Sequence, residues 1–208
     1  MIAMYHKIDI VSPTIWWATP RNLLRHINEL RRFEFVYLDD YDPANPRHVV
    51  LTFDDAYENF YHHAYPILKR LRIPFELFVI GDLIGEWNQF DDGEPLTRFA
   101  GMDQLCEIAD GGGRVQWHTR SHPALHEVSD AQIDHELTVP DEIRAFFPAP
   151  HMRWFSYPFG LHDERSVGLA RKKFAGAVSV VNGEREDRWQ LNRVLVHDRW
   201  SPPDKIIQ

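Results

Sequence analysis

Two adjacent carboxylates, Asp54 and Asp55, directly follow the apolar run Val49–Phe53. The run has the length and residue types of a buried strand, so both acids would lie at its carboxyl end, where parallel α/β folds build their sites. Neighbouring carboxylates repel, so either a cation keeps both ionised or one stays protonated. A bound metal ion would keep both carboxylates ionised. The alternative is a solvated loop in which an Asp caps the next helix.

Two histidines with H-x3-H spacing lie near the end of a second short apolar run, Arg114–His118. His118 is the last residue of this run, and His122 lies four residues after it. If the segment is helical, this spacing puts both imidazoles on one face with Cβ atoms about 5–6 Å apart. That separation suits a single metal ion, and two surface histidines are the alternative. A zinc protease would carry Glu directly after the first His. This chain has Thr119 there, which argues against a metalloprotease.

Taken together, two His and one Asp form a three-ligand set that leaves a position open for water, as in catalytic zinc sites. The remaining Asp is then free to act as a general base on that water. Non-haem iron oxygenases also use two His and one carboxylate, so this class is an alternative.

The elements that must position these residues alternate between strand-length runs and helical patterns. Several runs lack polar alternation, which is typical of strands covered on both faces. Repeated strand–helix alternation predicts crossover connections and a parallel sheet. We predict a single α/β domain over residues 1–208, a distorted TIM-like (β/α)7 barrel, with an open doubly wound sheet as the alternative. The predicted strands are Ile2–Tyr5, Val49–Phe53, Phe75–Ile80, Arg114–His118, Trp154–Pro158, Ala175–Val181 and Arg193–His197. The predicted helices are Pro20–Arg32, Tyr57–Leu71, Met102–Ala109, Asp130–Phe147 and His162–Phe174, of which Pro66 and Pro140 should bend or split two.

Composition excludes several classes of protein. The 208 residues include 23 Lys+Arg, 31 Asp+Glu and 1 Cys, for a net charge of −8. One cysteine cannot form an internal disulfide, and the acidic balance argues against nucleic acid as a partner. The N-terminal residues lack a basic segment followed by an apolar run, and no stretch approaches the roughly 20 apolar residues of a membrane span. We therefore expect a cytoplasmic protein with no membrane span.

The ordered motifs TFDD, HTRSH followed by Pro123, and FSYPFG resemble those of the polysaccharide deacetylases of carbohydrate esterase family 4, the NodB-homology domain. Further matches are MYHKI, PFELFVIGDLIG, HPALHEVSD and LNRVLVH, so the resemblance covers nearly the whole chain. It implies a distorted seven-unit (β/α) barrel and metal-dependent removal of N-acetyl groups from amino sugars.

The resemblance also implies roles for individual residues. Asp54 matches the general base, and Asp55, His118 and His122 match the ligands of a divalent metal, expected to be Zn²⁺. His197, in Leu195-Val196-His197, matches the general acid that protonates the leaving amine.

The motif Ser156-Tyr157-Pro158-Phe159 matches the segment whose last backbone N–H helps to hold the oxyanion. We expect Tyr157 and Trp189 to line a sugar groove, together with Trp154 and Phe155. Trp189 with Asp187 matches the family's fourth motif loosely.

The sequence departs from the family pattern at two positions near the proposed base. Ala56 stands where the family usually has Gly, which weakens a backbone role that needs a positive φ. Ser156 stands where an Arg would brace the catalytic Asp. We hypothesise that Arg193 approaches the same Asp from another strand.

The predicted function is hydrolysis of an N-acetylated amino sugar in a polysaccharide, an oligosaccharide or a nucleotide- or lipid-linked precursor of a surface polysaccharide. One alternative is a deformylase that acts on a lipid-linked amino sugar. Another is a catalytically silent sugar-binding domain, which the departures at Ala56 and Ser156 suggest. The sequence indicates no oligomeric state.

Overall fold

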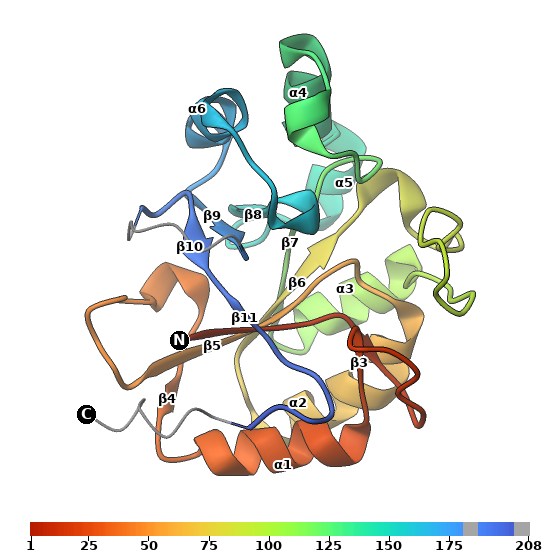
Figure 1. Ribbon diagram of the computed structural model, residues 1–208, viewed down its shortest axis with the longest axis vertical. Helices are drawn as coiled ribbons and strands as arrows, with labels where there is room; N and C mark the ends of the chain where they lie inside the picture. The colour runs from red at the N-terminus through yellow and green to blue at the C-terminus, as the bar shows by residue number, and fades with distance from the viewer. Residues whose placement is uncertain (181–186, 202–208) are drawn as a thin grey trace.

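A parallel sheet forms the centre of the molecule, and helices pack around it (Figure 1). The computed structural model describes residues 1–180 and 187–201. Within these ranges the strands of the nine-stranded sheet follow the order β10-β9-β8-β7-β6-β5-β1-β11, with β4 paired to β5 off this path. The strands of the sheet are β1 (Ile2–Tyr5), β4 (Glu34–Phe35), β5 (His48–Phe53), β6 (Phe75–Val79), β7 (Gly113–Trp117), β8 (Trp154–Ser156), β9 (Gly176–Ser179), β10 (Leu191–Asn192) and β11 (Val194–Leu195). A separate two-stranded sheet pairs β2 (Lys7–Ile8) with β3 (Trp17–Ala18).

The segment from Leu191 to Leu195 nearly closes the sheet into a barrel. Its first half, β10, pairs with β9, and its second half, β11, pairs with β1 at the opposite edge. Counted as one strand, this segment completes seven strand positions with β1 and β5–β9 in the described chain. The sevenfold barrel prediction is therefore confirmed, and the open doubly wound alternative is wrong.

The bounds of this last strand differ from the prediction of Arg193–His197. The pairing starts two residues earlier, is divided at Arg193 and ends at Leu195, because one short segment has to serve two edges. The predicted strand Ala175–Val181 corresponds to β9, and its last residue, Val181, lies outside the described residues.

Apolar side chains on both faces of the barrel explain why the strand sequences lack polar alternation. One set of alternate residues fills the interior, and the other set packs between the strands and the helices. The interior cluster contains Ile2, Leu38, Val50, Phe78, Trp154, Val178 and Leu191. The outer cluster includes Ala3, Tyr5, Val49, Leu51, Phe53, Leu77, Val79, Val115 and Phe155.

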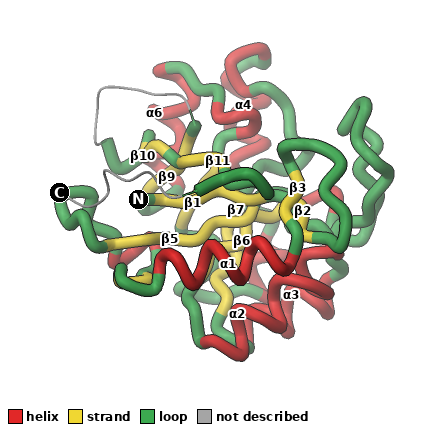
Figure 2. The backbone as a smooth tube through the Cα atoms, turned by 60° about the horizontal axis from the view of Figure 1, so that its bottom comes forward, coloured by secondary structure: helices red, strands yellow, loops and turns green. Residues whose placement is uncertain are grey.

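The helices lie outside the barrel, with α1–α3 on one side of the strands and α4 and α6 on the other (Figure 2). The predicted split of Asp130–Phe147 is confirmed, because Pro140 caps the second of two helices. The predicted helix Tyr57–Leu71 starts later, with a π-helix over Phe60–Ala64 that continues into α2, and Pro66 lies in the first turn of α2. The α-helices are α1 (Pro20–Leu30), α2 (Tyr65–Leu71), α3 (Met102–Asp110), α4 (Asp130–Leu137), α5 (Asp141–Phe146) and α6 (Glu164–Lys173).

Strand register places the chemistry-bearing residues at one rim of the barrel. Tyr5 of β1 is level with Phe53 of β5, and Trp117 of β7 is level with Phe155 of β8. These strands are parallel, so the next residue on each emerges at their carboxyl ends. The residues at these positions are His6, Asp54, His118 and Ser156.

Deeper in the barrel lies a fully buried carboxyl group, that of Glu76 on β6. It accepts hydrogen bonds from the Leu38 N–H and from Gln116 Nε2, both at 2.8 Å. Burial raises the pKa of Glu76 to about 7, because the charged form loses its hydration. Between its ordinary pKa and about 7 the folded state therefore holds a proton that an unfolded chain releases.

We expect Glu76→Gln to flatten the pH dependence of folding stability. The stabilising contribution of the protonated group is complete below its ordinary pKa and is lost as pH rises through about 7. The free energy of unfolding of the parent should fall, relative to the variant, by about 2–3 kcal/mol between pH 5 and pH 8. Urea unfolding at both pH values measures this difference, with Glu142→Gln on the exposed face of α5 as the control. Parallel pH profiles of parent and Glu76→Gln would contradict the expectation.

Candidate active site

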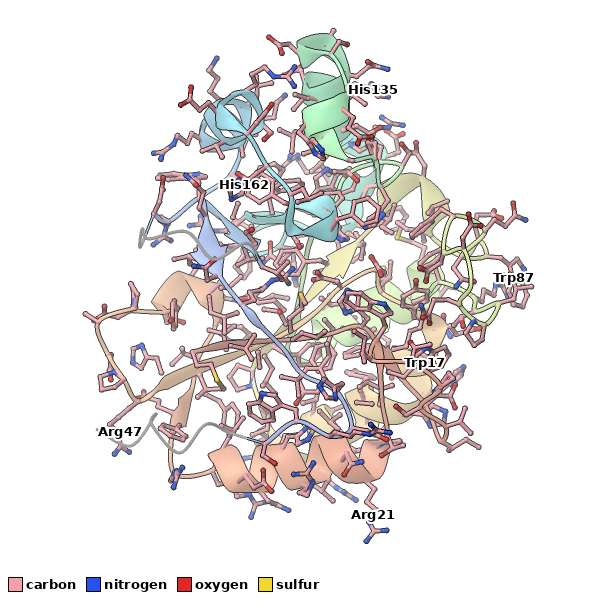
Figure 3. The ribbon with its side chains drawn as sticks, viewed as in Figure 1. Trp17, Arg21, Arg47, Trp87, His135 and His162 are labelled. Atoms are coloured by element: carbon pink, nitrogen blue, oxygen red, sulfur yellow. The ribbon has the colours of Figure 1, made fainter. Side chains whose placement is uncertain are left out.

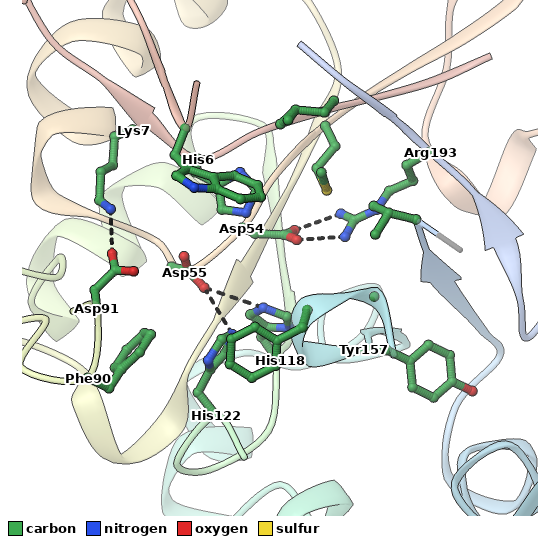
Figure 4. A pocket seen from close by; sticks show the side chains of 16 residues that line it. His6, Lys7, Asp54, Asp55, Phe90, Asp91, His118, His122, Tyr157 and Arg193 are labelled. Carbon is green, nitrogen blue, oxygen red and sulfur yellow. Dashed lines mark hydrogen bonds and ion pairs between the residues drawn. The ribbon is translucent and has the colours of Figure 1, made fainter. Parts of the chain in front are cut away.

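Three side chains with metal-binding atoms converge at the rim of the barrel. Asp55 Oδ1 lies 3.4 Å from His118 Nε2 and 3.7 Å from His122 Nε2 (Figure 4). One ligand atom from each residue lies within 4.8 Å of the others. The three side chains are almost completely buried. The structure thus brings together the three residues predicted to bind a metal.

The polar atoms of this cluster fit a divalent cation. Asp55 Oδ1 and His122 Nδ1 are buried without a hydrogen-bond partner within residues 1–180 and 187–201. An unsatisfied buried carboxylate oxygen is costly, and a cation between it and the two imidazole nitrogens would compensate it. Burial lowers the pKa of His122 to about 4, which keeps its ring in the neutral form that ligates metals. His118 Nδ1 lies 2.7 Å from the Ser156 carbonyl, a contact that leaves Nε2 to face Asp55.

The two histidines meet through a tight loop rather than a helix. Thr119 and His122 have positive φ angles of 69° and 64°, and the His122 N–H donates to Thr119 Oγ1 at 2.9 Å. Glu136 of α4 accepts two successive backbone N–H groups of the loop, at 2.8 and 2.9 Å. The condition of a helical H-x3-H segment is therefore not met, although the two rings converge on Asp55.

Asp54 forms a buried, bidentate ion pair with Arg193. Arg193 Nη1 lies 2.7 Å from Asp54 Oδ1, and Nη2 lies 2.6 Å from Oδ2. Arg193 also donates to Ser156 Oγ at 2.9 Å, and that hydroxyl donates to Asp54 at 3.2 Å. Burial alone would raise the pKa of Asp54, but the Arg193 charge and then His118 outweigh it, so the pKa lies below its ordinary value. Arg193 thus reaches Asp54 from the closing segment, and Ser156 completes the contact.

Backbone strain gathers around the site. Among the residues that the structure describes, seven other than Gly have a positive φ, and five of these are Asp55, Ala56, Thr119, His122 and Phe159. Each such residue costs on the order of 1–3 kcal/mol and persists only where surrounding contacts fix it. Ala56 adopts φ 57° without being Gly, and its carbonyl accepts the Ala100 N–H at 2.8 Å. The departure from Gly therefore does not prevent the left-handed conformation.

A pocket of about 470 Å³ opens over these groups. His122 lies between two aromatic rings, with Phe90 stacked at 4.7 Å and Phe159 edge-on at 4.8 Å between ring centroids. Phe159 is 58% exposed and follows Pro158 in a short 3-10 turn. Tyr157 lines the pocket wall.

The other aromatic side chains proposed for a sugar groove lie elsewhere. Trp154 and Phe155 are fully buried in the two apolar clusters. The Trp189 indole donates to the Phe174 carbonyl at 3.0 Å and packs on the outer core. Only its backbone approaches the site, because the Trp189 carbonyl accepts the Tyr157 hydroxyl at 3.0 Å. Trp189 is therefore a supporting residue rather than part of the groove wall, which corrects the expectation.

His197 does not join this pocket. The barrel strand ends at Leu195, and His197 lines a different cavity with Thr14 and Asn22. Its Nδ1 accepts the backbone N–H of Arg199 at 3.2 Å. The chain has already left the rim at this point, so the geometry gives no support to the assignment of His197 as general acid.

His6 is a pocket residue that was not predicted as part of the site. It lines the pocket with both aspartates, and its Nδ1 is buried with no partner in the described part of the chain. Burial lowers the pKa of His6, whereas the nearby charges of Asp55 and Asp54 oppose this shift. The sequence did carry a signal for it, because His6 directly follows a predicted strand, as Asp54 does.

Comparisons with known proteins show the family and the fold of the chain. Residues 41–176 match the family model for polysaccharide deacetylases, so the chain belongs to this family, and the resemblance inferred from the motifs is confirmed. YxkH of Bacillus subtilis, named for the same family, is 29% identical over 126 residues, 60% of this chain and 41% of that protein. The poly-beta-1,6-N-acetyl-D-glucosamine N-deacetylase of Staphylococcus aureus is 26% identical over 180 residues, 79% of this chain and 60% of that protein.

The chain thus spans less than two thirds of either curated relative. Among solved structures, the Streptococcus pyogenes deacetylase PplD in complex with acetate superposes with a TM-score of 0.76 at 23% identity. That match covers 93% of this chain and 91% of PplD, and it shows the shared fold. In the described part of the chain, every helix is too short or too polar to cross a bilayer. The cytoplasmic location remains a prediction.

Proposed function

We propose that the protein hydrolyses the N-acetyl group of an amino sugar in a polysaccharide or oligosaccharide. One observation carries the proposal: the unpartnered Asp55 oxygen faces two imidazole nitrogens beside a second aspartate that Arg193 holds ionised. This pairing of a three-ligand metal site with a free carboxylate is suited to hydrolysis. The name of the S. aureus relative, an N-acetyl-D-glucosamine polymer deacetylase, supports the same class of substrate.

Asp55, His118 and His122 would hold a divalent metal, and two imidazoles with one carboxylate favour Zn²⁺. When bound, such a metal polarises the acetyl carbonyl and lowers the pKa of water. The ligand set leaves room for both because the protein supplies only three donor atoms.

The protein's own residues supply the proton transfers. Asp54 takes a proton from the attacking water, and its ion pair with Arg193 fixes the direction of the carboxylate. As the C–O bond forms and the C–N bond breaks, His6 gives a proton to the departing amine nitrogen, and acetate and a free amine result. Burial lowers the pKa of His6, and the nearby carboxylates of Asp55 and Asp54 favour the protonated ring that gives this proton. The Phe159 backbone N–H helps to hold the oxyanion.

The residues that line the pocket suit a sugar. Aromatic side chains, including Trp16, Phe90 and Phe159, line it beside the polar cluster, and flat rings suit the apolar face of a pyranose. A finished polysaccharide and its nucleotide- or lipid-linked precursor both contain the N-acetylated amino sugar. The departures at Ser156 and Ala56 do not favour a silent domain, because Arg193 and the positive φ of Ala56 compensate for them.

The test is release of acetate from N-acetylglucosamine oligomers and from nucleotide- and lipid-linked N-acetylated sugars, compared with formate release from N-formyl analogues. Metal-loaded protein should release acetate, and chelation should stop it. Preferential release of formate would indicate a deformylase. Consumption of O₂ with no acyl release would indicate an iron oxygenase.

We expect His6→Gln to reduce kcat for deacetylation by about 10²-fold, the lower range for loss of a general acid. His197→Gln serves as the matched control and should stay within about twofold of the parent, because His197 lines another cavity. Both variants should keep their metal, which elemental analysis checks. If His197→Gln lost activity while His6→Gln kept the activity of the parent, the assignment of His197 as the general acid would be restored.

A further inference from the structure

A second cavity, of about 350 Å³, lies beside the catalytic pocket. It is bounded by the loop after β2, by the segment that enters the π-helix, and by the long loop between β6 and α3. Figure 3 labels Trp17, the first residue of β3, and Trp87, in the long loop between β6 and α3. Its chemically relevant lining residues are Asp9, Trp17, Glu58, Asn59, His63 and Trp87.

An unused hydrogen-bond donor lines this cavity. Asn59 is 7% exposed, and its Oδ1 accepts the Ile8 N–H at 3.4 Å. Its Nδ2 is buried with no partner among the residues placed by the structure. A buried amide donor costs free energy until an acceptor reaches it, so the cavity offers a ready position for a ligand oxygen.

The rim of the cavity combines an open indole ring with carboxylates. Trp87 is 47% exposed, although its backbone is fixed by a bridge to Arg98. Asp9 and Glu58 supply acceptor oxygens, with His63 Nε2 3.5 Å from Asp9 and His62 Nε2 3.9 Å from Glu58. An indole face with hydroxyl acceptors and one amide donor matches a pyranose ring, whose apolar face stacks and whose hydroxyls donate and accept.

The two cavities share a wall held together by an ion-pair cluster. Lys7 Nζ lies 2.5 Å from Asp91 and 3.3 Å from Glu94, and the Trp17 indole donates to Glu94 at 2.6 Å. Trp16 lines the catalytic pocket, whereas the next residue, Trp17, lines the second cavity. A chain of linked sugars that extends from the catalytic pocket would cross this cluster to reach the second cavity.

We propose that this cavity binds a further hexosamine unit of the same glycan chain, distant from the unit that reacts. The proposal rests on the proposed function, because it takes the glycan as substrate. Trp87 stacks on the sugar, Asn59 Nδ2 donates to one of its oxygens, and the two carboxylates accept from its hydroxyls. Longer oligomers therefore bind more tightly than short ones, by contacts that take no part in the reaction.

The experiment measures calorimetric Kd values for β-1,6-linked N-acetylglucosamine dimers and hexamers, alongside acetate release from both. The hexamer should bind the parent about tenfold more tightly than the dimer. Trp87→Ala should bring the hexamer within about twofold of the dimer, and Trp87→Phe should retain most of the difference. Asn59→Asp, which keeps the acceptor for Ile8 but removes the donor, should act like Trp87→Ala. The control is Phe146→Ala, at another exposed aromatic ring, on α5.

The outcomes separate this inference from the proposed function. Equal hexamer affinity in parent and Trp87→Ala, or no binding of either oligomer, overturns the second sugar site even if acetate is released. A hexamer preference that depends on Trp87 supports the site even if no acetate is released, and that result would reject only the deacetylase function. Thermal unfolding of Asn59→Asp shows whether this variant loses binding while it remains folded. If Asn59→Asp does not fold, the variants of the exposed Trp87 still test the second sugar site.

Discussion

Asp54→Asn should lower kcat for acetate release by about 10²–10⁴-fold, the usual contribution of a positioned general base. The amide has the shape of the carboxylate but cannot take a proton from the attacking water. Its neighbour Asp55 and the two histidines are unchanged, so the metal content should stay at the parent value. Initial rates with a saturating N-acetylglucosamine oligomer, together with elemental analysis of the same samples, measure both quantities. Undiminished turnover in Asp54→Asn would remove this residue from the reaction.

A second variant separates loss of the base from loss of the fold. Asp54→Asn leaves the Arg193 guanidinium buried without a counter-charge, and breaking a buried pair costs about 3–5 kcal/mol. The double variant Asp54→Asn/Arg193→Met removes both charges and should recover much of that stability in urea unfolding. Its activity should stay at the level of Asp54→Asn. Recovery of activity together with stability would mean that the single variant was merely misfolded.

Asp55→Ala and His118→Ala should each abolish stable metal binding and reduce acetate release by at least about 10³-fold, because metal-assisted hydrolysis depends on the intact ligand set. The parent should also gain stability when Zn²⁺ is added, by about 2.7 kcal/mol at a free concentration 100 times Kd. Neither variant should show this gain. Thermal unfolding with and without Zn²⁺ therefore tests the site without any assay of activity.

His135→Ala provides the control for these metal-ligand variants, because His135 is exposed on α4 and remote from the pocket lining (Figure 3). It should retain both the metal and the stabilisation by Zn²⁺. Zinc-dependent stabilisation that survives in Asp55→Ala and His118→Ala but fails in His135→Ala would place the metal elsewhere.

Local sequence patterns were sufficient to predict most of the barrel. Runs such as Val49–Phe53 contain no polar alternation, because one set of side chains faces the interior cluster and the other faces the helices. The division of the last strand at Arg193 was not predictable in this way. It follows from closing the ring, since the segment must pair with β9 and with β1 in succession.

The residues of contiguous motifs were predictable, and so was the approach of Arg193 to Asp54 from another strand, whereas the place of His6 was not. Asp54 with Asp55, and His118 with His122, each come from one short loop. His6 takes its place only because β1 and β5 are in register at Tyr5 and Phe53. The assignment of His197 depended on the chain staying at the rim, but the strand ends at Leu195.

The position of Arg193 at the closing segment links assembly of the site to the order in which the chain becomes available. A nascent chain that has emerged only as far as Gln190 contains Asp54 and all three residues of the metal cluster, but not the guanidinium that holds Asp54. In such a chain β1 and β9 are also exposed edges, because the segment that pairs with both is missing. Completion of the barrel and placement of the Arg193 guanidinium against Asp54 therefore depend on the same short segment, so a partly synthesised chain would contain the Asp55, His118 and His122 cluster beside an unpaired Asp54.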